Sequence, residues 1–198
     1  PVRASAFANA LLTGQAGHLQ MHAQFQFGNL ASLCLLDTRQ YRDPQVCTKE
    51  GKSGSGMVDP DQCATWDDPA RSMLGVAQEQ WLDQRFAQAI QSGAPRWNLV
   101  GQQTLLCPRD LRPGPQRFFW NDGWDGYPAA RQRLLQSLEK HQVPNAVFLG
   151  GDVHENWVGH VMPSQAKQSG EALAVEFCVT SITSNSGRSN ERVPTVLA

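Results

Sequence analysis

The sequence lacks any hydrophobic run long enough to cross a membrane, because no window approaches about 18 consecutive apolar residues. It also lacks an excess of charge: 17 basic and 18 acidic residues leave a formal net charge of −1. This balance gives no electrostatic reason to expect nucleic acid or an anionic membrane as a partner. No segment repeats at a fixed period, which excludes a solenoid or propeller array. A signal-peptide pattern is absent as well, which by itself says nothing about export.

What the chain does contain is apolar runs alternating with helical patterns along 198 residues. Strands are predicted at 25–28, 30–36, 97–103, 145–149, 157–162 and 173–179. Helices are predicted from Leu74 to Gln91, where apolar residues recur at i+4 steps, and from Pro128 onward. The stretches 43–70 and 107–127 show no period and are predicted as irregular connections. Strands that alternate with helices indicate an α/β fold, and the length fits one domain.

The most informative motif is Gly150-Gly151-Asp152-Val153-His154, which directly follows an apolar strand. The glycines permit a tight turn and the close approach of a ligand. If the extended backbone continues, Asp152 and His154 point the same way, because side chains alternate with period two. A carboxylate oxygen and an imidazole nitrogen suit a metal such as Zn, Fe or Mn, or a general acid/base pair. The alternative is an aspartate that caps a turn beside a partly exposed histidine.

The five cysteines include no Cys-x-x-Cys pair. Cys34 and Cys178 lie in apolar strand-like runs and are predicted to be core thiols. Cys47 and Cys63 flank a loop, and a disulfide that closes about 15 residues would add about 3 kcal/mol of stability in an oxidising compartment. The sequence leaves open whether this disulfide forms.

Six motifs stand in order along the chain. They are Leu36-Asp37-Thr38-Arg39-Gln40-Tyr41-Arg42, Met73-Leu74-Gly75 with Gln80-Trp81-Leu82, Trp97 with Gln102-Gln103, Trp124-Asp125-Gly126-Tyr127-Pro128-Ala129-Ala130-Arg131, Gly151-Asp152-Val153-His154 and Thr180-Ser181-Ile182-Thr183-Ser184. In these motifs and their order, the chain from about Phe25 onward resembles the PhoD-like alkaline phosphatase/phosphodiesterase family.

The resemblance implies a calcineurin-like metallophosphoesterase fold, an α/β two-sheet β sandwich flanked by helices with metals at the strand ends. It implies that Asp152 and His154 are metal ligands and catalytic residues, in a centre that holds iron and calcium in this family. The implied reaction is metal-dependent hydrolysis of phosphate monoesters or diesters by a metal-bound hydroxide. Because many members are secreted, an extracytoplasmic location, periplasmic or secreted, is expected.

The family's upstream metal-binding motifs have no counterpart in this sequence. We therefore expect residues 1–198 to form the C-terminal portion of a single PhoD-like metallophosphatase domain, inactive alone. Half of a sandwich leaves apolar faces and strand edges uncovered, so self-association is expected. One alternative is a non-catalytic binding module derived from a metallophosphatase. Another is a non-phosphatase α/β enzyme in which Asp152 and His154 form an acid/base dyad.

Arg39 and Arg42 follow Asp37 at the end of a predicted buried strand. An arginine fork there could bind a phosphate oxygen or brace the carboxylates, so Arg39 is a candidate catalytic residue and Arg42 a candidate for binding the substrate. Asp37 is predicted to contact the metal ligands, and not the metal itself, and so to orient them. The alternative is an Asp–Arg pair that only ties down the loop.

Tyr127 and Arg131 lie at the start of the second predicted helix, whose N-terminus favours anions. Both are candidates for binding the substrate, and the alternative for Tyr127 is packing between helix and sheet. Gln102 and Gln103 end a strand on the same rim. They are predicted to support the metal ligands through hydrogen bonds.

Overall fold

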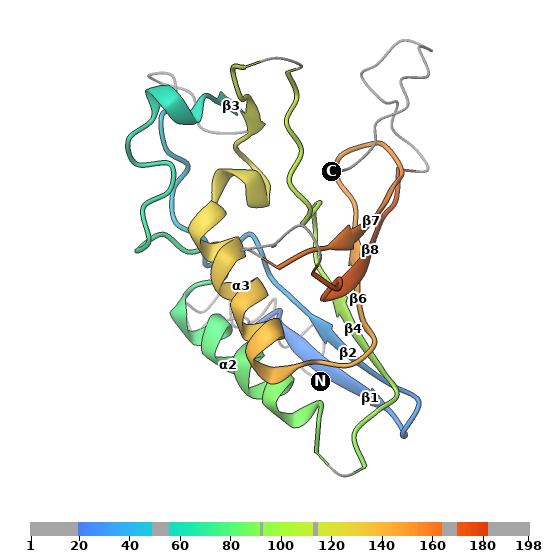
Figure 1. Ribbon diagram of the computed structural model, residues 1–198. Coiled ribbons are helices and arrows are strands. Elements are labelled where there is room, and N and C mark those ends of the chain that lie inside the picture. Colours follow the sequence, from blue (N-terminus) through green and yellow to red (C-terminus); the bar gives the residue numbers. More distant parts are fainter. Residues whose placement is uncertain (1–19, 49–55, 92, 113–114, 164–169, 182–198) are drawn as a thin grey trace, which may run out of the picture.

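The computed structural model describes residues 20–48, 56–91, 93–112, 115–163 and 170–181. The helices in these residues are α2 (Val76–Gln88) and α3 (Pro128–His141), with short 3-10 turns η1 (Pro60–Gln62) and η2 (Trp124–Gly126). The strands are β1 (Ala23–Phe27), β2 (Ala31–Leu35), β3 (Met57–Val58), β4 (Trp97–Gly101), β5 (Phe119–Trp120), β6 (Ala146–Gly150), β7 (Trp157–Val161) and β8 (Ala174–Cys178). This arrangement confirms the predicted α/β class (Figure 1).

Six strands form one mixed sheet in the order β1-β2-β4-β6-β8-β7. The four central strands are parallel, and an antiparallel partner closes each edge, β1 beside β2 and β7 beside β8. Parallel neighbours need long connections, and these contain α2 between β2 and β4, α3 between β4 and β6, and β7 between β6 and β8. Gly28, with a φ of 55°, permits the short turn from β1 to β2. The carboxyl ends of β2, β4 and β6 therefore lie at one edge of the sheet.

Helices α2 and α3 pack side by side against one face of this sheet (Figure 1). Leu82 and Phe86 of α2 and Leu134 and Leu138 of α3 are buried, each pair at i+4 spacing. They share a core with the fully buried Phe148 of β6. The apolar period of the sequence thus predicted the face that each helix buries. The predicted end of the first helix was wrong, because α2 ends at Gln88 and Ile90 beyond it is 60% exposed. Neither these helices nor any other in the described residues is long and apolar enough to cross a membrane.

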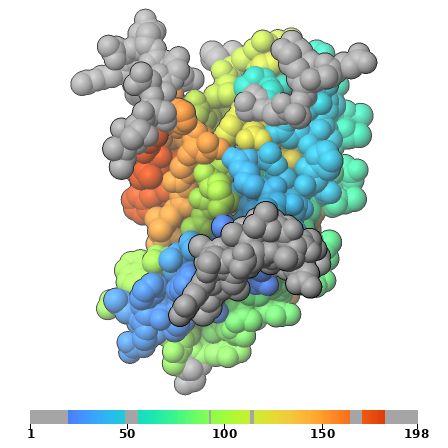
Figure 2. Space-filling model, turned by 180° about the vertical axis from the view of Figure 1, so that it is seen from behind, coloured from blue at the N-terminus to red at the C-terminus, as the bar shows by residue number. Residues whose placement is uncertain are grey.

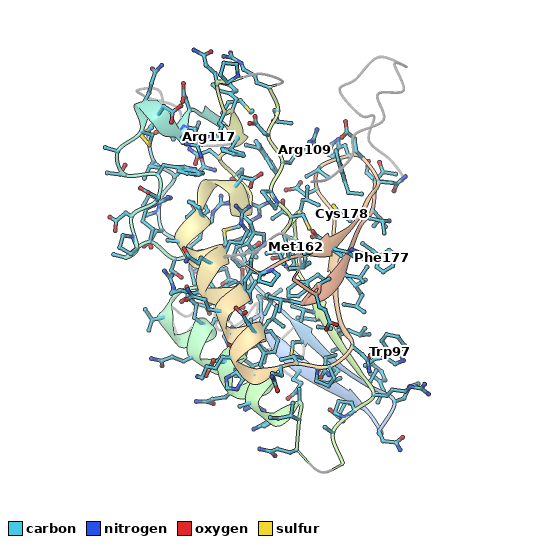
Figure 3. All side chains as sticks on the ribbon, viewed as in Figure 1. Trp97, Arg109, Arg117, Met162, Phe177 and Cys178 are labelled. Atoms are coloured by element: carbon cyan, nitrogen blue, oxygen red, sulfur yellow. A yellow bond between two sulfur atoms is a disulfide. The ribbon has the colours of Figure 1, made fainter. Side chains whose placement is uncertain are left out.

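The opposite face of the sheet is apolar and ranges from half-buried to exposed. Because residues paired in register point to the same face, one row across it consists of Leu33, Leu99, Val147 and Val175. In the next row Leu149 and Phe177 are paired, and their exposed fractions are 40% and 42%. Figure 3 shows Phe177 and Trp97 pointing away from the helices. The exposed sheet face, meaning the surface around Leu149 and Phe177, is consistent with the half-sandwich expectation, which stays a prediction.

The long connections after β2 and after β4 together form a second, smaller structure, since they contribute β3 and β5 respectively. Strands β3 and β5 pair antiparallel in a two-stranded sheet. Cys47 and Cys63 form the disulfide that the sequence left open, and Trp66 stacks on Phe119 with 5.5 Å between ring centroids. These contacts hold the connections in place although strands of two residues leave no recognisable pattern in the sequence.

We expect this chain to self-associate as its concentration rises, because association would remove the exposed sheet face from water. Light scattering coupled to size-exclusion chromatography measures this. Phe177→Lys should lower the association, since an unpaired charge resists burial. Ile90→Lys is the matched control just beyond α2, where the residue is 60% exposed, and should change nothing. A wild-type chain that stays monomeric at every concentration contradicts the expectation.

Candidate active site

Three neighbouring strands bring the candidate residues to one edge of the sheet. β2, β4 and β6 are parallel neighbours, and ligands commonly bind beyond the carboxyl ends of such strands. Arg39 follows β2, Gln103 follows β4 and Asp152 follows β6. Figure 2 shows the three segments next to one another on the surface, in light blue, green and orange. Side chains far apart in the sequence therefore meet here.

The Asp-x-His segment turns sharply and does not stay extended. β6 ends at Gly150, and Asp152 and His154 have φ angles of 68° and 58°. A Cβ at Gly150 would overlap the main-chain carbonyl of Thr104, whereas one at Gly151 would meet only ordinary contacts. The assumption that the strand continues through Asp152 is thus wrong. Asp152 and His154 nevertheless line the same cavity, which has a volume of about 220 Å³.

Arg39 lies between two carboxylates. Its Nη2 donates to Asp152 Oδ2 at 2.6 Å, and its Nη1 donates to Asp122 Oδ2 at 2.8 Å. Arg42 Nη2 is 2.8 Å from Asp122 Oδ1, and Arg42 Nη1 donates to the main-chain carbonyl of Asp122 at 2.9 Å. Asp122 therefore holds both guanidinium groups. Sequence reasoning missed it, because it lies in the stretch 107–127, which has no period.

Asp37 holds the loop after β2 through main-chain groups. Its Oδ1 accepts hydrogen bonds from the N–H of Arg39 at 2.9 Å and from the N–H of Gln40 at 3.0 Å. The guanidinium of Arg39 instead binds the carboxylates of other segments. The alternative of an Asp–Arg pair within this loop is therefore not what the structure shows.

Gln102 and Gln103 fix the backbone around the end of β4. Gln103 Oε1 accepts hydrogen bonds from the main-chain N–H and the hydroxyl of Thr38, at 2.8 and 2.6 Å. Gln102 Oε1 accepts from the N–H of Thr104 at 2.9 Å and from the indole N–H of Trp124 at 3.0 Å. Both amides thus support the rim of the site by holding neighbouring segments to β4.

The carboxylate of Glu176 on β8 holds the chain segment that follows β4. It is buried and accepts hydrogen bonds from the N–H groups of Leu106 and Cys107, at 2.7 and 2.8 Å. Burial raises the pKa of Glu176, and the two N–H donors oppose that shift. A sequence signal for this role existed, because Glu176 alternates with Ala174 and Cys178 and so falls on the buried face of its strand.

Tyr127 and Arg131 are turned into the interior. Tyr127 is only 1% exposed, and its hydroxyl donates to the main-chain carbonyl of Asp43 at 2.6 Å. Arg131 Nη1 donates to Asp125 Oδ1 at 2.5 Å. Burial raises the pKa of Asp125, and the positive charge of Arg131 opposes the shift. This arrangement favours the packing alternative for Tyr127 and does not support substrate contact by either residue.

Asp152 and His154 offer a metal ion one carboxylate and one imidazole. These donors fit a hard or borderline ion, and the Asp152 side chain is 39% exposed. Within the described parts of the chain, no group of three or more His, Cys, Asp or Glu side chains is arranged to hold a metal. The pair therefore fits one edge of a metal centre, short of the roughly four to six ligands that each ion needs.

Gly150→Ala should destabilise the chain by about 1–3 kcal/mol, because the added methyl group would overlap the Thr104 carbonyl in a packed region. Gly151→Ala is the matched control, since the nearest atom to its Cβ would be 3.7 Å away. Urea unfolding followed by tryptophan fluorescence measures both variants. Equal stability of the two would show that close approach at Gly150 is not a constraint.

Known proteins match this architecture and sequence. A model of the family described as PhoD-like phosphatase matches residues 1–197. Alkaline phosphatase D of Bacillus subtilis (strain 168) is 34% identical over 177 residues, which are 89% of this chain and 28% of the relative. A solved structure of PhoD superposes with a TM-score of 0.72 at 35% identity, over 84% of this chain and 30% of that one. This chain therefore spans less than a third of each relative, and it belongs to the PhoD-like phosphatase family.

Proposed function

We propose that this chain takes part in the metal-dependent hydrolysis of phosphate monoesters or diesters. The observation that carries the proposal is the meeting of Asp152 and His154 with an arginine at one sheet edge, where Arg39 Nη2 lies 2.6 Å from Asp152 Oδ2. Metal-binding donors beside a guanidinium fork are suited to a phosphoryl group. Membership of the PhoD-like phosphatase family supports the same reaction.

In this proposal Asp152 and His154 hold part of a metal centre that contains iron and calcium by family resemblance. When bound, the metals lower the pKa of a coordinated water and neutralise charge that develops on the phosphoryl group. Arg39 binds a phosphate oxygen through its planar fork. Arg42 adds positive charge, and Asp122 orients both guanidinium groups before the substrate arrives.

The exposed sheet face supports a second part of the proposal. We infer that residues 1–198 form the C-terminal portion of one PhoD-like catalytic domain, in which a further sheet covers Leu149 and Phe177 and further residues complete the metal centre. The relatives are long enough to contain such a portion, because this chain covers only 28% and 30% of them. An extracytoplasmic location fits the Cys47–Cys63 disulfide, since disulfides persist in oxidising compartments.

The alternative function is a non-catalytic binding module derived from a metallophosphatase. One observation favours it: in the described residues no third His, Cys, Asp or Glu side chain joins Asp152 and His154 to hold a metal. Such a module would bind a metal or a partner without turnover.

Metal content and hydrolysis measured on one sample separate these functions. The chain is purified without chelators, analysed by mass spectrometry for metals and assayed with p-nitrophenyl phosphate and bis-p-nitrophenyl phosphate. We expect neither stoichiometric metal nor turnover from this chain alone, because Asp152 and His154 supply two ligands. Stoichiometric metal with turnover would mean that other residues of the chain complete the centre. Stoichiometric metal without turnover would favour the binding module.

In a polypeptide that also contains the proposed upstream half, Asp152→Ala and His154→Ala should each lower turnover by more than about 100-fold. Changing a residue that hydrogen-bonds to a metal ligand already lowers metal affinity or activity by about 10- to 100-fold, and loss of the ligand itself should lower it more. Asp61→Ala removes an exposed aspartate 3.1 Å from Arg117 and is the control. Wild-type rates in both variants would refute the assignment of Asp152 and His154.

Arg39→Lys should lower turnover of the same polypeptide by about 10- to 100-fold, with the melting temperature unchanged. Lysine keeps the charge but cannot donate at once to a phosphate and to Asp122 through a planar fork, and hydrogen bonds to charged groups contribute about 1.5–3 kcal/mol. Arg117→Lys, in an exposed pair, is the control. Unchanged turnover would show that Arg39 only ties segments together.

A further inference from the structure

The cavity that Asp152 and His154 line extends into a recess with mainly apolar walls. We use the name recess for the part bounded by Trp120, Trp124 and Leu111. The ring of Trp124 is buried and its indole N–H is hydrogen-bonded, so this wall is fixed in position. A preformed apolar space next to candidate metal ligands is typical of a binding site for part of a small molecule.

We propose that the recess binds the alcohol portion of the phosphoester and selects an apolar or aromatic group of about one ring. This inference rests on the proposed function, because it assumes that a phosphoryl group binds at Arg39 and Asp152. Asp152 connects the two places: its Oδ2 is 2.6 Å from Arg39 Nη2, and the residue also lines the cavity. A phosphoryl group held at Arg39 can therefore direct its ester oxygen toward the recess.

The size of the cavity agrees with one ring. Its volume of about 220 Å³ exceeds the roughly 150 Å³ of a dry apolar cavity that accommodates benzene. The cavity is open to solvent on one side, so a larger group would bury about one ring and extend outward with the rest.

The charge in its walls is compensated. Arg109 lines the cavity, but its Nη2 is 3.0 Å from Glu155 Oε2, and its guanidinium lies 4.9 Å from the centroid of the Trp157 ring. Asp125 also lines the cavity and is paired with Arg131. Because these charges already have partners, the recess favours a neutral ring over a charged or strongly hydrated group.

Calorimetric titration of this chain with phenylphosphonate and with methylphosphonate tests the proposal. The two probes share the phosphonate group and differ in the group that would enter the recess. Phenylphosphonate should bind at least about 10-fold more tightly, because its ring is removed from water. Leu111→Asn should reduce this preference to less than about 3-fold by making one wall polar, with the affinity for methylphosphonate unchanged. Leu30→Asn, at an exposed leucine outside the cavity, should keep the full preference.

A second measurement keeps the test decisive if Leu111→Asn does not fold. In two-dimensional NMR spectra of the wild-type chain, the indole N–H signals of Trp120 and Trp124 should shift with phenylphosphonate and not with methylphosphonate. Equal affinities of the two probes, no binding of phenylphosphonate, unmoved indole signals, or a preference that survives in folded Leu111→Asn would each overturn the proposal.

The binding test is separable from the proposed function because it needs no turnover. A phenyl preference in this chain, with no ester hydrolysis by the polypeptide that contains the proposed upstream half, would overturn the proposed function alone. Hydrolysis by that polypeptide, without a phenyl preference, would overturn the recess alone.

Discussion

Buried carboxylates hold the irregular segments from which the candidate site is built. These segments have main-chain N–H groups that no helix or strand satisfies, and such groups need acceptors. Glu176 accepts two N–H groups after β4, Asp125 accepts that of Arg109, and Asp37 accepts two after β2. Burial raises the pKa of Glu176 and of Asp125, which reflects the cost of desolvating a carboxylate. Hydrogen bonds to charged groups, about 1.5–3 kcal/mol each, offset that cost and keep the rim of the site in place.

A second set of carboxylates positions the arginines of the candidate site. Asp122 holds Arg39 and Arg42, and Arg39 reaches on to Asp152, so three segments that are distant in the sequence share one set of ion pairs. The guanidinium groups are therefore oriented before any substrate binds, which lowers the entropy lost on binding. Asp152 also lines the cavity that contains the recess. A phosphoester placed here would have its charged part beside the arginines and its alcohol part in apolar surroundings.

One face of the main sheet is buried beneath α2 and α3, and the other is apolar and partly exposed. The proposed metal ligands are incomplete in a similar way: Asp152 and His154 fit one edge of a centre that needs about four to six ligands. Both observations support the proposal that residues from a further sheet complete the domain and the metal site together. In that case the docking of the further sheet would bury Phe177 and would also bring the remaining metal ligands to Asp152, so that metal binding would stabilise the folded domain.

The sequence by itself determined the α/β class, the positions of α2, α3 and the six main strands, and the candidate ligands Asp152 and His154, because each rests on a local pattern of several residues. Only the tertiary structure decided that Asp122 holds the arginines, that Tyr127 is turned inward, and that the chain bends after β6. It also decided the two-residue strands β3 and β5, which are too short for a pattern. Ion pairs and hydrogen bonds between distant segments depend on strand order and on the path of the loops, and no local pattern of residues encodes either.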